Sequence, residues 1–257
     1  MIRLSVLASS SKGNSSLVCT PECNILIDAG ISARRIKLAL EECGLHPNQL
    51  DAILITHEHH DHCRGLGQLD KKHQLHLYCT RHTGHDLRGK APNAIMTYLT
   101  TYEPFTIKDL CITPISTHHD ALDPLGFTIE HKGLRLGYVT DTGHVCDKMI
   151  QELQGLHGLY LESNYDPDML QNSGRSHALI GRIANNFGHL SNNQAAELVK
   201  KIAGKELQHL ILGHLSPDCN SPQLAYDCMK DCLDQLGLMP HLQYARATTR
   251  TPWAEIK

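Results

Sequence analysis

One short segment concentrates the residue types that bind metal ions. Residues 54–67 read LITHEHHDHCRGLG, so four histidines and one aspartate occupy the six positions from His57 to His62. His57 and His59 are two residues apart, and Asp61 and His62 follow in the same turn, so an extended loop could wrap these donors around a small cation. Imidazole and carboxylate together suit zinc, manganese or iron better than calcium, which prefers oxygen ligands. One ion that keeps an open coordination position needs fewer ligands than this segment offers. The segment therefore favours two ions that share a bridging carboxylate.

Ligand-type residues also end other apolar runs of the chain. Three further strand-like segments finish in RLGYVTDTGH, GLYLESNYD and HLILGHLSP, and another, ILIDAG, carries Asp28 at its end. Strand ends are places where a sheet holds side chains rigidly toward a shared crevice. Because the pattern recurs in both halves of the chain, it predicts one site assembled from distant segments.

Short apolar runs alternate with helical patterns along the whole chain. Helices are expected after Ser32, from the capping box of Ser191 and Gln194 to Gly204, and over 221–236. Strands so apolar are usually buried on both faces, so helices should cover the outer faces of two sheets that meet inside. We therefore predict an α/β fold, a four-layer αββα sandwich, in one domain without a linker, residues 1–257. The expected strands are 2–7, 17–20, 25–28, 52–56, 75–79, 110–115, 126–130, 134–140, 159–162 and 207–212.

Composition limits the class of protein. The chain is 41% hydrophobic and 20% charged, and its first apolar stretch is about six residues, shorter than the roughly 7–15 of a secretory signal. We expect a cytoplasmic protein with no membrane segment, whose ten cysteines, lacking any CxxC pair, are buried thiols. The net charge of −3 gives no overall positive field, which counts modestly against a nucleic-acid partner but leaves room for a local basic groove. The oligomeric state is left open.

The motif T-H-x-H-x-D-H at Thr56–His62 resembles the signature of the metallo-β-lactamase superfamily. Further segments, in order along nearly the whole chain, resemble the bacterial YycJ/WalJ family, which is close to ribonuclease Z and the PhnP-type phosphodiesterases. The resemblance implies an αββα sandwich with a dinuclear site at one edge of the paired sheets, holding two divalent ions, zinc or manganese, with iron also open. These segments are LASSSKGNSS, ILIDAG, STHHDALDPLGF, YVTDTG, LESNYD, GHLSN and LGHLSP.

The same resemblance assigns the metal ligands position by position. The histidine of HHDALDPLGF could be His118 or His119, and His119 is preferred because it stands immediately before Asp120, as in the HDA pattern of the family. The expected ligands are His57, His59 and His119 for one ion, Asp61, His62 and His214 for the other, and Asp141 as the bridge.

The resemblance also suggests how a phosphodiester would be cleaved. Two ions would lower the pKa of a shared water from about 15.7 toward neutrality, which supplies hydroxide as the nucleophile. The leaving alkoxide needs a proton, and LESNYD and GHLSN are similar to the ribonuclease Z motifs whose glutamate and histidine form a proton-shuttling pair. We therefore expect His189 as the general acid, Glu162 as its orienting partner, and Asp61 in the catalytic set as well as among the ligands. By spacing alone, His189 could be a neighbour of the helix cap Ser191, and Glu162 an ordinary salt-bridge partner.

Other polar residues have two interpretations each. Asp28 either supports the metal loop by hydrogen bonds or is a simple turn carboxylate. The SSSKGNSS segment at 9–16 either cradles a phosphate or forms a polar hairpin turn. Asn164, Arg175 and His177 either face a substrate or lie in a solvent-exposed loop.

The most specific function that the resemblance implies is a metal-dependent phosphodiesterase acting on nucleic acid, a 5′-to-3′ DNA exonuclease, because the similar family includes exonucleases that act on double-stranded DNA. One alternative is a hydrolase of the same fold that acts on a small cyclic phosphodiester, a lactone or a thioester. Glu162 and His189 favour a phosphodiester, because a thiolate leaves without an acid. A non-catalytic regulatory or binding module is a further alternative, and the complete ligand set argues against it.

Overall fold

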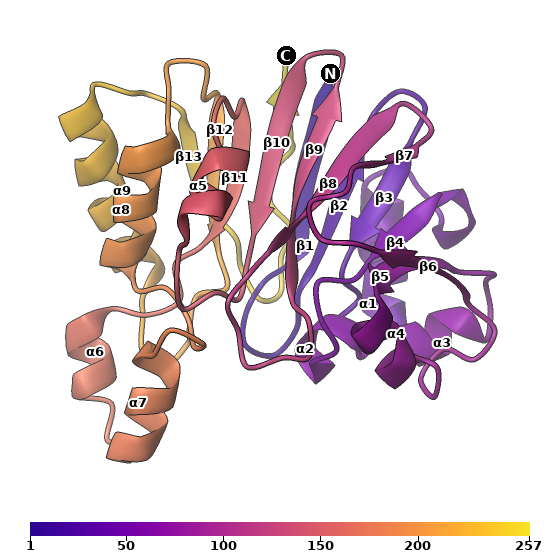
Figure 1. Cartoon of the computed structure of the whole chain (residues 1–257), viewed down its shortest axis with the longest axis horizontal. Helices are drawn as coiled ribbons and strands as arrows, with labels where there is room; N and C mark the ends of the chain where they lie inside the picture. The colour runs from indigo at the N-terminus through magenta and orange to yellow at the C-terminus, as the bar shows by residue number, and fades with distance from the viewer.

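The apolar runs of the sequence form strands, and the computed structural model, which describes all 257 residues, arranges them in two seven-stranded sheets (Figure 1). The first sheet has the order β14-β1-β2-β3-β4-β5-β6, and the second has the order β13-β12-β11-β10-β9-β8-β7. The first comprises β1 (Ile2–Ala8), β2 (Ser15–Cys19), β3 (Asn24–Ile27), β4 (Ala52–Leu54), β5 (His76–Thr80), β6 (Ile95–Leu99) and β14 (Ala254–Ile256). The second comprises β7 (Phe105–Ile107), β8 (Leu110–Ser116), β9 (Leu125–His131), β10 (Leu134–Val139), β11 (Gly158–Glu162), β12 (His209–Gly213) and β13 (His241–Tyr244).

Helices cover the outer face of each sheet, so the molecule has four layers (Figure 1). The helices α1, α3 and α4 pack on the first sheet, and α5, α8 and α9 pack on the second. The bounds are α1 (Ala33–Glu42), α2 (His60–Cys63), α3 (Leu66–Asp70), α4 (Arg81–Leu87), α5 (Asp147–Glu152), α6 (Pro167–Gln171), α7 (His177–Ala184), α8 (Asn192–Ile202) and α9 (Pro222–Leu236), with one 3₁₀ turn at Pro47–Gln49. This arrangement confirms the predicted αββα sandwich.

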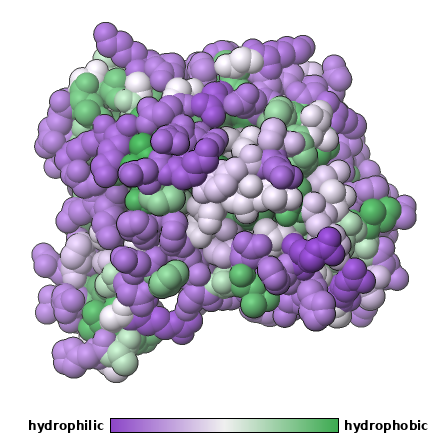
Figure 2. Space-filling view, viewed as in Figure 1, coloured by the Kyte–Doolittle hydropathy of each residue, from purple (hydrophilic) through white to green (hydrophobic).

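The strands of both sheets contribute side chains to a central core and to an outer one. On β12, Ile211 belongs to the core between the sheets, whereas Leu210 and Leu212 pack under the outer helices. This alternation follows from the two-residue period of a strand. In the central core the rings of Tyr138 and Tyr160 stack with centroids 4.3 Å apart. Outside, the surface seen in Figure 2 is mostly hydrophilic, with hydrophobic residues in small separate areas.

The predicted elements are present, and the structure adds several that the pattern did not indicate. The caps Ser32, Ser191 and Ser221 each accept a backbone N–H of their helix, as expected. The helix α8 ends at Ile202, short of the expected Gly204, because Ala203 adopts an extended conformation. Four strands were not predicted, namely β6, β7, β13 and β14. They are the outermost strands of the two sheets, short and in part exposed, so their apolar signal is weak.

The strand directions place many carboxyl ends at one edge of the sandwich. Strands β3 to β6 run parallel in the first sheet, and β10 to β13 run parallel in the second. Strand β8 is antiparallel to β9, which is antiparallel to β10, so β8 ends at this same edge. Side chains that follow these strands are therefore brought together, as in other open sheets of this kind.

The two ends of the chain meet in the first sheet, where β14 pairs with β1 (Figure 1). This pairing supports our proposal that residues 1–257 form one domain. All ten cysteines are free thiols, but the expected burial holds for only six of them, since Cys43, Cys146 and Cys228 are half-buried and Cys111 is exposed. None of the nine helices combines the length and the apolar character that a membrane span requires.

Candidate metal centre

Three residues that follow strands at the shared edge hold left-handed backbone conformations. Asp28 after β3, Asp141 after β10 and His214 after β12 have φ angles of 60°, 50° and 53°. Such angles are unfavourable for residues other than glycine and persist only where the surroundings impose them. The strands thus end in sharp turns that place these three side chains at the edge of the sandwich.

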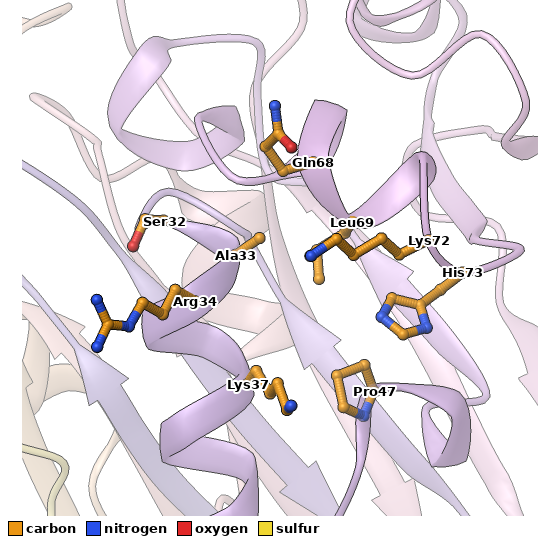
Figure 3. Close-up of a pocket in the computed structure, with 9 residues that line it drawn as sticks. All are labelled: Ser32, Ala33, Arg34, Lys37, Pro47, Gln68, Leu69, Lys72 and His73. Atoms are coloured by element: carbon orange, nitrogen blue, oxygen red, sulfur yellow. The ribbon is translucent and has the colours of Figure 1, made fainter.

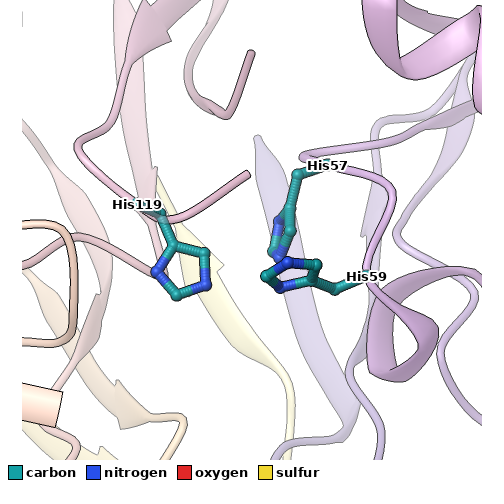
Figure 4. A group of neighbouring side chains, drawn as sticks. All are labelled: His57, His59 and His119. Atoms are coloured by element: carbon teal, nitrogen blue, oxygen red, sulfur yellow. The ribbon is translucent and has the colours of Figure 1, made fainter. Parts of the chain in front are cut away.

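Three histidines from two separate loops form the first group of possible ligands (Figure 4). His57 and His59 follow β4, His119 follows β8, and their nearest ring nitrogens lie within 4.8 Å of one another. In Figure 4 the three rings point toward a common space. His118 lies apart from this group, since its ring packs against that of His144 with centroids 5.2 Å apart. The structure therefore places His119, the preferred alternative, beside the other two.

A second group lies next to the first and mixes carboxylate with imidazole. Ligand atoms of Asp61, His62 and His214 also lie within 4.8 Å of one another. The Oδ2 atom of Asp61 is 3.4 Å from Nε2 of His62 and 3.6 Å from Nε2 of His214. These residues come from the loop after β4 and from the end of β12, so each sheet contributes to the group.

The carboxylate of Asp141 lies between the two groups. Its Oδ2 is 3.3 Å from Nε2 of His62, and its Oδ1 is 3.6 Å from Nε2 of His119. Burial alone would raise the pKa of Asp141, but His214 and His62 outweigh burial and hold the pKa well below its usual range. The same Oδ1 is also 3.4 Å from Nδ1 of His214. Asp141 is therefore an ionised carboxylate within reach of both groups, which is the position that a bridging ligand requires.

Four of the candidate ligand histidines, His57, His62, His119 and His214, use Nδ1 for a hydrogen bond within the protein. This leaves the Nε2 atom of each ring for another partner. In His57 and His214 that Nε2 atom is buried and has no hydrogen-bond partner in the protein. Burying such a group unpaired is costly, whereas a metal ion would satisfy it, and an Nδ1 bond to a fixed acceptor is the usual support of a metal-binding histidine. The residues present therefore fit divalent metal ions. The Nδ1 partners are the hydroxyl of Thr56 for His57 at 3.0 Å, Asp28 for His62 at 2.7 Å, the carbonyl of Gly188 for His119 at 3.0 Å, and Glu162 for His214 at 2.8 Å.

Glu162 is fully buried beside this centre and accepts hydrogen bonds through both of its oxygens. Its Oε2 accepts from Nδ1 of His189 at 2.9 Å and from Nδ1 of His214 at 2.8 Å. Burial would raise the pKa of Glu162, but the charge and hydrogen bond of His189 outweigh it, and the pKa falls to about 2. Backbone N–H groups of Asp141, Thr142 and Leu190 donate to the same carboxylate. The structure therefore brings Glu162 and His189 together, and it also places His214 on the same carboxylate, a contact that the sequence did not indicate.

The comparison with known families agrees with this geometry. The family described as "Beta-lactamase superfamily domain" matches residues 23–214. The chain is also 32% identical over 239 residues to Exodeoxyribonuclease YycJ of Bacillus anthracis, which covers 92% of this chain and 90% of that protein. It is 33% identical to Exodeoxyribonuclease WalJ of Streptococcus pneumoniae, with 99% of this chain and 98% of that protein covered.

The chain belongs to the beta-lactamase superfamily. This membership confirms the resemblance seen in the sequence, and the chain is accordingly a metal-dependent hydrolase. Two solved structures show the same fold. YhfI from Bacillus subtilis superposes with a TM-score of 0.72 at 18% identity, covering 98% of this chain and 100% of that one. Short-form human tRNase Z superposes with a TM-score of 0.67 at 14% identity, covering 99% of each chain.

The ILIDAG segment holds the loop that carries the superfamily motif in place, through hydrogen bonds and close packing. Asp28 is fully buried, and its carboxylate accepts from the backbone N–H and hydroxyl of Thr56 as well as from His62. Gly30 packs against the loop so closely that a Cβ atom there would lie 1.5 Å from the carbonyl oxygen of Asp61. These contacts favour the supporting role for Asp28 over a simple turn carboxylate. They also explain why residue 30 is a glycine, since no side chain would fit there.

The SSSKGNSS segment is used mostly inside the protein. The Ser9 hydroxyl contacts Tyr160 at 2.8 Å and accepts the backbone N–H of His214 at 2.7 Å. Asn14 donates to Asp61 at 3.3 Å. Of this segment only Ser11 lines a cavity that opens over the candidate metal centre and is described below. The segment therefore fixes the ends of neighbouring strands, and little of it is free to cradle a phosphate.

A cavity of about 360 Å³ opens over the candidate metal centre. Of the residues with two interpretations, Arg175 lines this cavity, whereas Asn164 is buried and donates to the carbonyl of His214. Arg182 from α7 also lines the cavity and pairs with Asp120 at 2.6 Å. Sequence reasoning missed Arg182, because an arginine on a helix that carries mostly solvent-facing residues has no distinguishing spacing.

Proposed function

We propose that the protein is a dinuclear metal-dependent phosphodiesterase that degrades DNA in the 5′-to-3′ direction. The observation that carries the proposal is the pair of ligand groups on either side of Asp141, with the buried Glu162–His189 pair beside them. The names of the YycJ and WalJ proteins, which are similar to this chain over most of its length, support DNA as the substrate.

Each ion would be held by one of the two groups. A pair of divalent ions supplies an activated water and neutralises negative charge on the phosphoryl oxygens. The donor set of imidazole and carboxylate is compatible with zinc and with manganese, and we propose one of these two. The proposed ligands are His57, His59 and His119 for one ion, Asp61, His62 and His214 for the other, and Asp141 for both.

His189 would supply the proton that the leaving oxygen of the DNA chain requires. Its Nδ1 donates to Glu162, so Nε2 is the atom that can carry a proton to a substrate, and the side chain lines the cavity. Burial lowers the pKa of His189, but the carboxylates of Glu162 and Asp141 outweigh burial and raise it above the usual value. Bound cations would act in the opposite direction and bring it closer to neutral pH. A histidine held in this way contributes about 10²–10⁴-fold as a general acid.

The test is metal analysis of the purified protein together with incubation against three substrates. These are duplex DNA labelled at either end, single-stranded RNA, and bis(p-nitrophenyl) phosphate as a small phosphodiester. We expect two divalent ions per chain and release of nucleotides from the 5′ end of DNA. Asp141→Asn, which keeps the size of the side chain but removes its charge, is the matched control and should be inactive. Cleavage of the small phosphodiester without cleavage of DNA would instead favour a small-molecule hydrolase.

A further inference from the structure

A groove of about 450 Å³ lies on the outer side of the first sheet, between α1 and α3, and carries basic residues (Figure 3). Three cationic side chains, Arg34, Lys37 and Lys72, line it together with His73, and none of its nine lining residues is acidic. In Figure 3, Lys37 and Lys72 extend from opposite walls into the space between them. The chain as a whole has a net charge of −3, so this concentration of positive charge is local.

The positive charge of the groove is poorly neutralised. Arg34 and Lys72 have no carboxylate partner within 4.0 Å, and Lys37 has only Glu41, at 3.6 Å on the same helix with both side chains about half exposed. Exposed pairs of this kind contribute little. By contrast, the arginines at the cavity over the metal centre are paired, Arg175 with Asp218 and Arg182 with Asp120. Unneutralised positive charge is therefore gathered in the groove, whereas the two arginines of the cavity are paired.

Both walls of the groove begin at the loops that carry the metal centre. Helix α1 starts at Ala33, shortly after Asp28, and α3 starts at Leu66, shortly after His62. Backbone hydrogen bonds join these two loops, from Ala29 N–H to the carbonyl of His62 at 2.8 Å and from Gly65 N–H to the carbonyl of Ala29 at 2.7 Å. A polyanion that reaches the metal centre and extends beyond it on this side would meet the groove.

We infer that the groove between α1 and α3 binds the phosphate backbone of the DNA substrate away from the cleaved bond. This inference rests on the proposed function and adds a second contact region to it. Lys37 and Lys72 would each neutralise a phosphate, and the release of condensed counterions would make the contact dependent on salt. Burial, together with the charges of His46, Lys72 and Lys37, lowers the pKa of His73, so this ring adds little positive charge until a bound phosphate favours its protonation.

The experiment compares the wild-type chain with the double variant Lys37→Gln/Lys72→Gln. KM and kcat for a labelled duplex are measured over a series of salt concentrations, and bis(p-nitrophenyl) phosphate is measured in parallel. We expect a higher KM for DNA, a slope of log KM against log salt that is smaller by about 1 for each lysine, and an unchanged rate on the small phosphodiester. Lys37→Arg/Lys72→Arg keeps the charge and should restore the wild-type slope.

The matched control is Lys132→Gln/Lys205→Gln, which removes the same charge elsewhere. Lys132 lies in the β9–β10 turn and Lys205 precedes β12, so both are at the ends of strands opposite to the metal centre, and neither has a carboxylate partner. The control should retain the wild-type salt slope. An equal fall of the slope in the control, or an unchanged slope in Lys37→Gln/Lys72→Gln, would overturn the inference. In either case, cleavage of DNA by the wild type would still support the proposed function. A wild-type chain that hydrolyses only the small phosphodiester would overturn both.

Discussion

The substitution Glu162→Gln tests whether one buried carboxylate supports both the metal ligand His214 and the acid His189. The two oxygens of Glu162 together accept five hydrogen bonds from these rings and from the backbone. Glutamine has one oxygen and one NH2 group, so at least one set of donors, for example the Leu190 N–H now 2.8 Å from Oε1, would face another donor. A hydrogen bond to a charged group contributes about 1.5–3 kcal/mol, and a buried donor left unpaired adds about 1–3 kcal/mol.

We therefore expect Glu162→Gln to lower the free energy of unfolding by about 3 kcal/mol, which corresponds to a fall in Tm of roughly 6–12 °C for a chain of this size. Loss of the support to His214 should also weaken metal binding by about 10–100-fold, measured by competition with a chelator. The matched variant is His189→Gln, which should keep the wild-type metal affinity while turnover falls by about 10²–10⁴-fold.

The comparison of the two variants decides the role of Glu162. Should Glu162→Gln bind metal as tightly as the wild type and differ from it only in turnover, Glu162 would orient His189 alone. Should His189→Gln also lose metal, the separation between a metal-supporting histidine and a proton-donating one would be refuted.

Three further substitutions probe the centre and the loop beneath it. His59→Ala should abolish phosphodiesterase activity with an unchanged circular dichroism spectrum, and full activity of this variant after treatment with a chelator would remove the metal from the mechanism. His189→Ala should lose turnover mainly on alkyl phosphodiesters, because nitrophenolate leaves without a proton; equal losses on both substrates would argue against its role as the acid. Gly30→Ala should lower Tm and metal content, since its Cβ would lie 1.5 Å from the carbonyl oxygen of Asp61. The control Gly181→Ala has nothing within 4 Å of its Cβ and a helical position that favours alanine, so it should leave metal content unchanged and raise Tm slightly.

Local patterns in the sequence were sufficient for the layers of the fold and for the kind of chemistry. Runs such as LILG on β12 are apolar because both faces of the strand are covered, so the strand can be recognised in the sequence from its composition. The same holds for helix caps such as Ser191, which act within one turn. Strand β6, with an exposed Ile95 at the sheet edge, could not be recognised in this way, because its stability depends on pairing with β5.

The partners of each ligand depended on tertiary structure. His118 and His119 are the same residue type at successive positions of one loop, and only the packing of that loop directs His119 to the centre and His118 toward His144. Likewise, no spacing could connect Glu162 to His214, which lie 52 positions apart and meet because β11 and β12 run parallel and end at the same edge. The sequence by itself determined which residue types could bind metal, since that is a property of each side chain. The folded chain decided which of them act together, because contacts between strands depend on the register of both sheets.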